Sequence, residues 1–308
     1  MGTLIARVGP HDRWWSGSGG KESGEASGTM ASMTDSQVGD GVGQGRRAPS
    51  SKVREPRFRS VLWCLVAFAV DYGLAVWTGV GQSAENSLIA GETARARIFG
   101  WKEWVPPLTR ETLVLALGLA LILTVTLVRR CWREGVAAVG IVVVTVAATE
   151  ALHAVLPRPG LSPVPPGLAG ASFPSGTTAI VAGLALGVAT VSSARTRSYV
   201  AAAGAVWLAV IAGALQALSW HRPSDVLGAT LVACACYGAA SALLRPVRVG
   251  RSRSLPPLAL AAVGALLASS REDSLVRPLV FSGVALVCSA LLWFTATGMP
   301  VGLTRTSR

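Results

Sequence analysis

The chain has 308 residues, of which 51% are apolar and only 14% are charged, and its mean hydropathy is +0.50. Ordinary soluble domains carry about 25% charged residues, so this composition argues against a soluble globular protein and indicates an integral membrane protein. The formal net charge is +12. The arginines that carry it are divided among separate loops and form no single patch, which argues against nucleic acid as a partner.

The first 56 residues are rich in glycine, serine and arginine and show no hydrophobic periodicity. Such a segment cannot bury enough apolar surface to offset the entropy lost on ordering. We therefore predict that residues 1–56 form a disordered basic tail.

From residue 60 onward, apolar stretches recur between short arginine-bearing loops, and most approach the roughly 20 residues that a helix needs to cross a bilayer. They predict an all-α fold, a polytopic transmembrane bundle of about eight helices. The seventh stretch is short and rich in alanine. The eight predicted spans are 60–80, 111–128, 135–156, 176–193, 199–219, 225–243, 256–270 and 278–297.

From Lys52 onward, the basic residues that flank the predicted spans are distributed unevenly, 15 on one side of the predicted membrane and eight on the other. Cytoplasmic loops carry the excess of lysine and arginine, so both termini are predicted to be cytoplasmic. We expect a multi-pass protein of the plasma (inner) membrane. The heavy use of arginine, alanine and glycine is typical of a GC-rich bacterial genome.

The cysteines have no spacing that indicates a zinc site or a disulfide framework, and we interpret them as free small hydrophobic residues. We expect no metal and no cofactor. The cysteines, all in or beside apolar runs, are Cys64, Cys131, Cys234, Cys236 and Cys288.

The predicted topology gathers three polar segments on the extracytoplasmic side. They are LPRPG (156–160), FPSGTT (173–178) and SWHRPSDVLG (219–228). Arg158, taken alone, is interpreted as an arginine that snorkels to the headgroups. Ser175 is a natural N-cap for the helix that follows, but exposed N–H groups at a helix start beside Gly176 also form an anion site.

His221 is one of only three histidines in the chain. Asp225, four residues later, is placed to orient the imidazole and raise its basicity. The alternative is structural, because Ser224 can cap the following helix and Asp225 suits its first turn.

These residues resemble the motifs of the type 2 phosphatidate phosphatases, or lipid phosphate phosphatases, a family related to the vanadium haloperoxidases. The family motifs are lysine, six residues and Arg-Pro; Pro-Ser-Gly-His; and Ser-Arg, five residues, histidine, three residues and aspartate. The residues that match are Arg158 and Pro159, then Pro174, Ser175 and Gly176, and finally His221 and Asp225.

The resemblance covers about residues 60–245 and implies a six-helix membrane core at 57–246, followed by an additional hairpin and short tail at 247–308. It implies hydrolysis of a phosphorylated or diphosphorylated membrane lipid, including polyprenyl-type lipids, at the extracytoplasmic face. By the same resemblance, His221 attacks phosphorus to form a phosphohistidine, and Asp225 polarises the His221 imidazole. Phosphate oxygens are held by Arg158 and by the amides of Ser175 and Gly176.

The chain departs from the family at three places. Ala151 stands at the lysine position, Thr177 stands where the second-motif histidine belongs, and the Ser-Arg pair is Ala214-Leu215. An alignment that deletes the histidine has the same chemical result, loss of a proton donor worth about 10²- to 10⁴-fold in rate.

Three residues are candidate substitutes for the lost groups: Arg222 for positive charge, His153 as an acid, and Thr177 itself. The alternative for His153 is structural, because Glu150 lies three residues earlier on the same helix face and the two can satisfy each other or a neighbouring helix. Asp71 is a further candidate, because a charge inside a membrane helix is costly. The alternative to slow hydrolysis is a catalytically impaired pseudo-phosphatase that binds lipid or acts as a scaffold. A transporter or channel is less favoured, because the polar residues cluster in outer loops.

Overall fold

The computed structural model describes residues 55–89, 110–164, 172–243, 256–270 and 276–298. All described residues belong to one compact unit, Pro49–Arg308. The predicted disordered tail lies outside the described residues, except that residues 55 and 56 begin the first helix.

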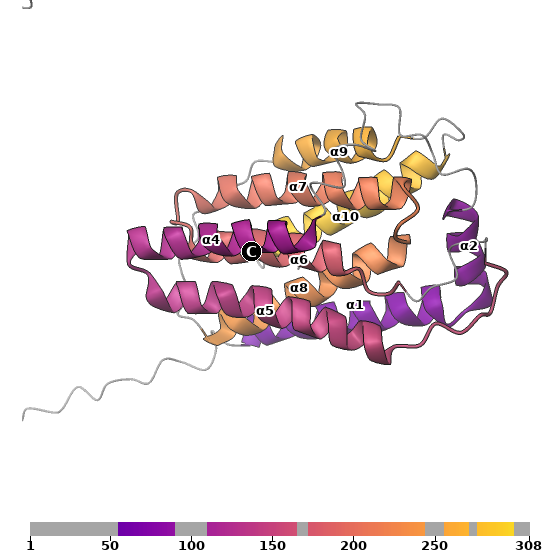
Figure 1. Ribbon diagram of the computed structural model, residues 1–308, viewed down its shortest axis with the longest axis horizontal. Helices are drawn as coiled ribbons and strands as arrows, with labels where there is room; N and C mark the ends of the chain where they lie inside the picture. Colours follow the sequence, from indigo (N-terminus) through magenta and orange to yellow (C-terminus); the bar gives the residue numbers. More distant parts are fainter. Residues whose placement is uncertain (1–54, 90–109, 165–171, 244–255, 271–275, 299–308) are drawn as a thin grey trace, which may run out of the picture. The chain divides into compact units, whose positions relative to one another are not determined.

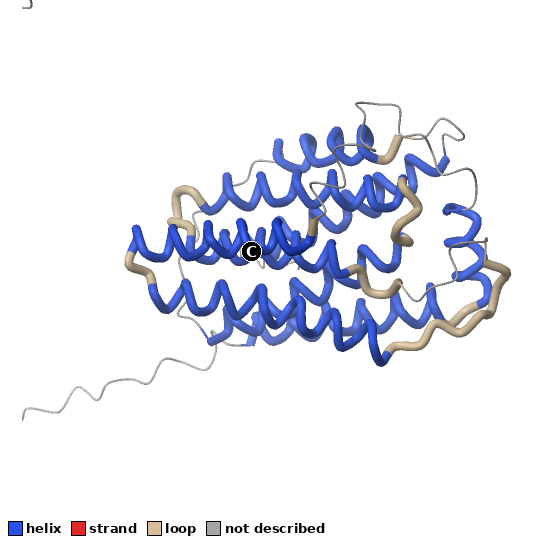
Figure 2. Tube along the Cα trace, viewed as in Figure 1, coloured by secondary structure: helices blue, strands red, loops and turns tan. Residues whose placement is uncertain are grey.

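The described parts of the chain are all-helical and contain no strand, which confirms the predicted fold class (Figures 1 and 2). The helices are α1 (Glu55–Val76), α2 (Gly79–Ile89), α4 (Glu111–Arg129), α5 (Trp132–Val155), α6 (Gly176–Val191), α7 (Arg197–Ala217), α8 (Pro223–Leu243), α9 (Pro256–Ala268) and α10 (Val276–Thr297).

Six of these helices are long and apolar enough to cross a membrane, namely α1, α4, α5, α7, α8 and α10. The other two predicted spans correspond to the shorter apolar helices α6 and α9. The 16 residues of α6 extend only about 24 Å, less than the roughly 30 Å hydrocarbon core. It is nonetheless apolar on all sides, as expected of a helix surrounded by protein, and 14 of its residues are buried.

The main core is built mostly from α6, α7, α8, α9 and α10, with Ile141 of α5, and is rich in alanine. Small residues let membrane helices approach closely, which gives packing in place of a hydrophobic driving force. Gly187 of α6 shows this, because a Cβ there would lie 3.2 Å from the carbonyl oxygen of Ala138 on α5. By contrast, α1 and α4 present rows of large apolar side chains outward, as lipid-facing helices do.

Two arginines hold the C-terminal end of α6. Arg197 is buried and donates from Nε to the carbonyl of Ala189 (3.0 Å) and from Nη2 to that of Thr190 (3.3 Å). Arg129 donates to the carbonyl of Val191. The last carbonyls of a helix lack partners within the helix and carry its negative dipole end, so guanidinium groups stabilise them.

The helix α2 was not predicted from the sequence. It follows α1 after a turn in which the hydroxyl of Thr78 accepts a hydrogen bond from the Gly81 amide (2.9 Å), an N-cap arrangement. Its buried residues are Gln82, Glu85, Asn86 and Ile89, one helical face that is mostly polar. In Figure 1, α2 lies toward the same end of the bundle as the end of α5 and the turn between α7 and α8.

Candidate functional site

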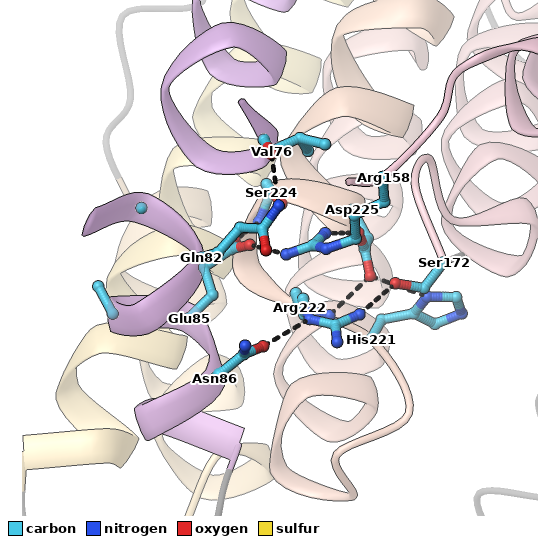
Figure 3. Close-up of polar contacts among 12 residues, drawn as sticks. Val76, Gln82, Glu85, Asn86, Arg158, Ser172, His221, Arg222, Ser224 and Asp225 are labelled. Atoms are coloured by element: carbon cyan, nitrogen blue, oxygen red, sulfur yellow. Dashed lines mark hydrogen bonds and ion pairs between the residues drawn. The ribbon is translucent and has the colours of Figure 1, made fainter. Parts of the chain in front are cut away.

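Polar side chains from four segments meet at this end of the bundle (Figure 3). They come from α2, from the loop after α5, from the segment before α6 and from the turn that leads into α8. The three motif-bearing segments are therefore neighbours in space, as the sequence predicts. The contribution from α2 is new.

The turn between α7 and α8 has a defined backbone geometry that places His221. The amide of Trp220 donates to the Leu215 carbonyl (3.0 Å) and that of Ser219 to the Gln216 carbonyl (3.0 Å), the pair of bonds of a Schellman motif. Ser219 occupies its left-handed position at φ 58°, where glycine is usual. Its hydroxyl donates to the Ile89 carbonyl (3.3 Å), which joins the turn to the end of α2.

The beginning of α8 holds Asp225 in position. Pro223 is the first helical residue, a place where its missing N–H costs nothing. The carboxylate of Asp225 reaches back and accepts the amide of Arg222 through Oδ2 (2.8 Å), as the acidic member of a capping box does. Asp225 is completely buried.

His221 and Arg158 both face the Asp225 carboxylate. The Nδ1 atom of His221 lies 3.5 Å from Oδ2, the outer limit of a hydrogen bond, and Nη1 of Arg158 lies 3.7 Å from Oδ1. The side chain of His221 is 20% exposed and that of Arg158 is 10% exposed. Since Nδ1 faces the carboxylate, Nε2 is the ring nitrogen on the side away from Asp225.

The loop that carries Arg158 is fixed by side chains of α1 and α2. The hydroxyl of Tyr72 donates to the Pro157 carbonyl (2.7 Å), and Nε2 of Gln82 donates to the Pro159 carbonyl (2.5 Å). Prolines have no N–H, so their carbonyls are the groups that need partners. These two bonds hold the backbone on both sides of the arginine.

Glu85 of α2 lies closer to the Arg158 guanidinium than Asp225 does. Its Oε2 accepts from Nη2 of Arg158 at 2.8 Å, and its Oε1 accepts from the Ser224 amide in the first turn of α8 at 2.9 Å. The guanidinium of Arg158 thus lies between two buried carboxylates, Glu85 and Asp225 (Figure 3).

Arg222, predicted as a substitute source of positive charge, is buried beside Arg158. It donates from Nη1 to the Ser172 hydroxyl (2.8 Å) and from Nε to Oδ1 of Asn86 (3.4 Å). Burial, and then the positive charge of Arg158, lower the pKa of Arg222 below its usual value, while Asp225 and Glu85 counteract this. The two guanidinium groups repel each other, so an anion near both is favoured.

Ser175 is the N-cap of α6, as predicted: its hydroxyl accepts from the Thr178 amide (3.3 Å) and from the Thr178 hydroxyl (3.0 Å). Its own amide donates to the Asp225 carbonyl (3.0 Å), which ties the beginning of α6 to that of α8. Of the two amides expected to hold phosphate, that of Ser175 is therefore already engaged.

Two carboxylates lie near the next two residues of α6. A Cβ on Gly176 would meet Oε1 of Glu150 at 3.2 Å and Oε1 of Glu111 at 3.8 Å, and the Thr177 hydroxyl donates to Oε1 of Glu111 (2.6 Å). Both glutamates are exposed. The first turn of α6 is thus bordered by negative side chains.

The remaining candidates lie at the margin of the cluster. His153 is exposed in the last turn of α5, and none of the contacts described for this part of the chain joins its ring to Arg158 or His221. Asp71 on α1 interacts electrostatically with Glu85 and Asp225, and its Oδ2 is buried without a hydrogen-bond partner among the described residues.

Sequence reasoning missed Glu85, Asn86 and Ser172. The signal for α2 was present, because Gln82, Glu85, Asn86 and Ile89 follow the i, i+3, i+4, i+7 spacing of one helical face. A search for apolar stripes passes over it, since three of these four residues are polar. Ser172 left no signal beyond its proximity to the Pro-Ser-Gly motif.

Together, the fold and the cluster define a polytopic helical membrane protein with a buried, charged group of side chains at one end of its bundle. No protein-family model, no curated protein and no solved structure matches the chain. The case for a function therefore depends on the residues of the cluster.

Proposed function

We propose that the protein is a membrane enzyme of the lipid phosphate phosphatase type, which acts slowly on a phosphorylated or diphosphorylated lipid through His221. The observation that carries the proposal is that Asp225 faces both His221 (3.5 Å) and Arg158 (3.7 Å). These residues lie in two of the three segments that resemble the family motifs. The uneven distribution of basic residues favours a site on the outer face of the plasma membrane, with both termini cytoplasmic.

In the proposed reaction, Nε2 of His221 attacks phosphorus, an N–P bond forms and the bond from phosphorus to the leaving oxygen breaks. Water then hydrolyses the phosphohistidine and releases inorganic phosphate. Asp225, at Nδ1, holds the ring orientation and stabilises the positive charge that develops on the imidazole. Arg158 and Arg222 offset the charge on the phosphoryl oxygens.

In the described part of the chain, the position that carries the family's proton donor holds no acid. Thr177 stands at the family's histidine position, and its hydroxyl donates a hydrogen bond to Oε1 of Glu111 (2.6 Å). A leaving phosphate is a much weaker base than an alkoxide and needs protonation less. We therefore expect a lipid diphosphate to be cleaved faster than a lipid monophosphate.

The proposal is tested by trapping the intermediate. Purified protein is mixed with a radiolabelled lipid diphosphate, quenched in alkali and assayed for phosphohistidine, which is stable to base. The wild type is expected to form it, His221→Ala is expected not to, and His153→Ala, which alters an exposed histidine outside the cluster, is expected to retain it. Labelling that survives His221→Ala, or faster cleavage of the monophosphate, contradicts the proposal.

The second candidate is a pseudo-phosphatase that binds a phosphorylated lipid without cleaving it. It is favoured by the threonine at position 177 and by the engagement of the Ser175 amide with the Asp225 carbonyl. The two candidates differ in the trapping experiment. Saturable binding of phosphatidic acid that depends on Arg158, without any phosphohistidine, supports the pseudo-phosphatase.

A further inference from the structure

The buried cluster contains a set of anion-binding donors, here called the anion seat, which the chain occupies with the carboxylate of Glu85. The donors are the Arg158 guanidinium and the Ser224 amide in the first turn of α8, where the helix dipole also favours negative charge. Glu85 accepts from both, at 2.8 and 2.9 Å. A carboxylate with one oxygen on a guanidinium and the other on a helix-terminal amide uses the groups that would bind a phosphate.

The seat has more donors than Glu85 satisfies. Nη1 of Arg158 and the hydroxyl of Ser224 are buried and have no hydrogen-bond partner among the described residues. The Arg158 side chain is 10% exposed and its guanidinium lies between Glu85 and Asp225. A phosphate carries three acceptor oxygens and more charge than a carboxylate, so it can engage donors that a carboxylate leaves unused.

The helix that supplies Glu85 is attached mainly through polar contacts. It has 11 residues, fewer than an isolated helix needs for stability, and Ile89 is the only apolar residue among those it buries. Gln82 and Asn86 bond to the carbonyls of Pro159 and Pro163. Elements with few buried apolar contacts open at low free-energy cost, so α2 is suited to move while the long helices stay packed.

We propose that Glu85 occupies the seat of the ligand's phosphate, and that a phosphorylated headgroup binds by displacing this carboxylate from Arg158 and the Ser224 amide. The inference rests on the proposed function for the identity of the ligand. It places the phosphate at the beginning of α8, whereas the first turn of α6 is bordered by Glu111 and Glu150. Glu85 is then an internal competitor that sets how readily the site accepts its ligand.

The test measures binding of inorganic phosphate to the full chain in phosphatidylcholine nanodiscs. Glu85→Gln removes the competing charge and keeps the side-chain volume, and about 10- to 100-fold tighter binding than wild type is expected, since hydrogen bonds to charged groups contribute about 1.5 to 3 kcal/mol. Glu134→Gln, the same change in the first turn of α5, is expected to leave the affinity unchanged. A parallel arm replaces inorganic phosphate with phosphatidic acid in the nanodisc and separates free phosphate from a lipid headgroup as the ligand.

Equal affinity of wild type and Glu85→Gln for both probes overturns the inference but leaves the proposed hydrolysis standing. Conversely, tighter binding by Glu85→Gln supports the inference even where no phosphohistidine forms. If neither the wild type nor Glu85→Gln binds phosphate although both are folded, the inference that this position is a phosphate site is wrong. If Glu85→Gln does not fold, the inference is tested instead by amide hydrogen exchange of residues 79–89 in the wild type, with and without phosphate. Faster exchange on adding phosphate supports displacement of α2, and unchanged or slower exchange contradicts it.

Discussion

Replacing Asp225 with asparagine tests whether the cluster is a coupled ionic network. The carboxylate is completely buried and faces Arg158 and His221, and it accepts the Arg222 amide (2.8 Å). Asparagine keeps the shape and one acceptor oxygen but removes the negative charge. Breaking a buried ion pair by removing one partner costs about 3 to 5 kcal/mol, because the remaining charge is left uncompensated.

The control is Glu134→Gln, which makes the same chemical change in the first turn of α5. Loss of a favourable dipole interaction there is expected to cost about 0.3 to 1 kcal/mol. Asp225→Asn should therefore lower the free energy of unfolding by at least about 2 kcal/mol more than the control. The chain supplies its own probe, since the free cysteines Cys234 and Cys288 are buried and are therefore expected to react with a thiol dye only on unfolding.

Unfolding is followed in mixed micelles as the fraction of SDS is raised, with dye labelling as the signal. The reasoning is refuted if Asp225→Asn unfolds at the same SDS fraction as Glu134→Gln. That result would mean that Asp225 carries no net charge interaction with Arg158 or His221. A loss of stability confined to Asp225→Asn agrees with the ion pairs seen in the structure.

Three further predictions concern α6. Gly183→Ala should be neutral or should stabilise the protein by up to about 1 kcal/mol, because the added Cβ would meet its neighbours at 3.5 Å or more. Gly187→Ala should cost about 1 to 3 kcal/mol, because the added Cβ would lie 3.2 Å from a backbone carbonyl. Unfolding in SDS compares the stabilities of the two variants. Ser175→Ala removes the N-cap and should cost about 1 kcal/mol in the same assay, with Ser87→Ala on the exposed face of α2 as the control. Thr177→His restores a proton donor and should raise the rate on a lipid monophosphate by up to about 10²-fold, with a smaller change on the diphosphate; an equal change on both contradicts the assigned role.

The fold was largely predictable because the bilayer restricts the options. A spanning segment must satisfy every backbone group internally, so apolar stretches between basic loops predict helices directly. The short α6 was found on the same grounds, and only its surroundings explain why 16 residues suffice: it is enclosed by other helices. Conversely, α2 was missed because its buried face is polar and its partners lie in other loops.

The site was predicted only as far as the motifs extend. Arg158, His221 and Asp225 were identified because their residue types and spacing resemble known motifs, and topology brought their segments to one end. Their partners come from distant parts of the chain: Arg158 pairs with Glu85 across 73 residues, and Arg222 with Ser172 across 50. Nothing local in the sequence specifies such pairings, since they depend on how the helices pack.

The most direct test of the central claim, that His221, Arg158 and Asp225 form one phosphate site, is an experimental structure of the protein with orthovanadate bound. Vanadate adopts the five-coordinate geometry of a phosphoryl group under attack. We expect vanadium to be bonded to Nε2 of His221, with the guanidinium of Arg158 in hydrogen-bond contact with the vanadate oxygens and the Asp225 carboxylate beside Nδ1. Vanadate bound away from His221, or an imidazole directed into the lipid, would contradict the central claim.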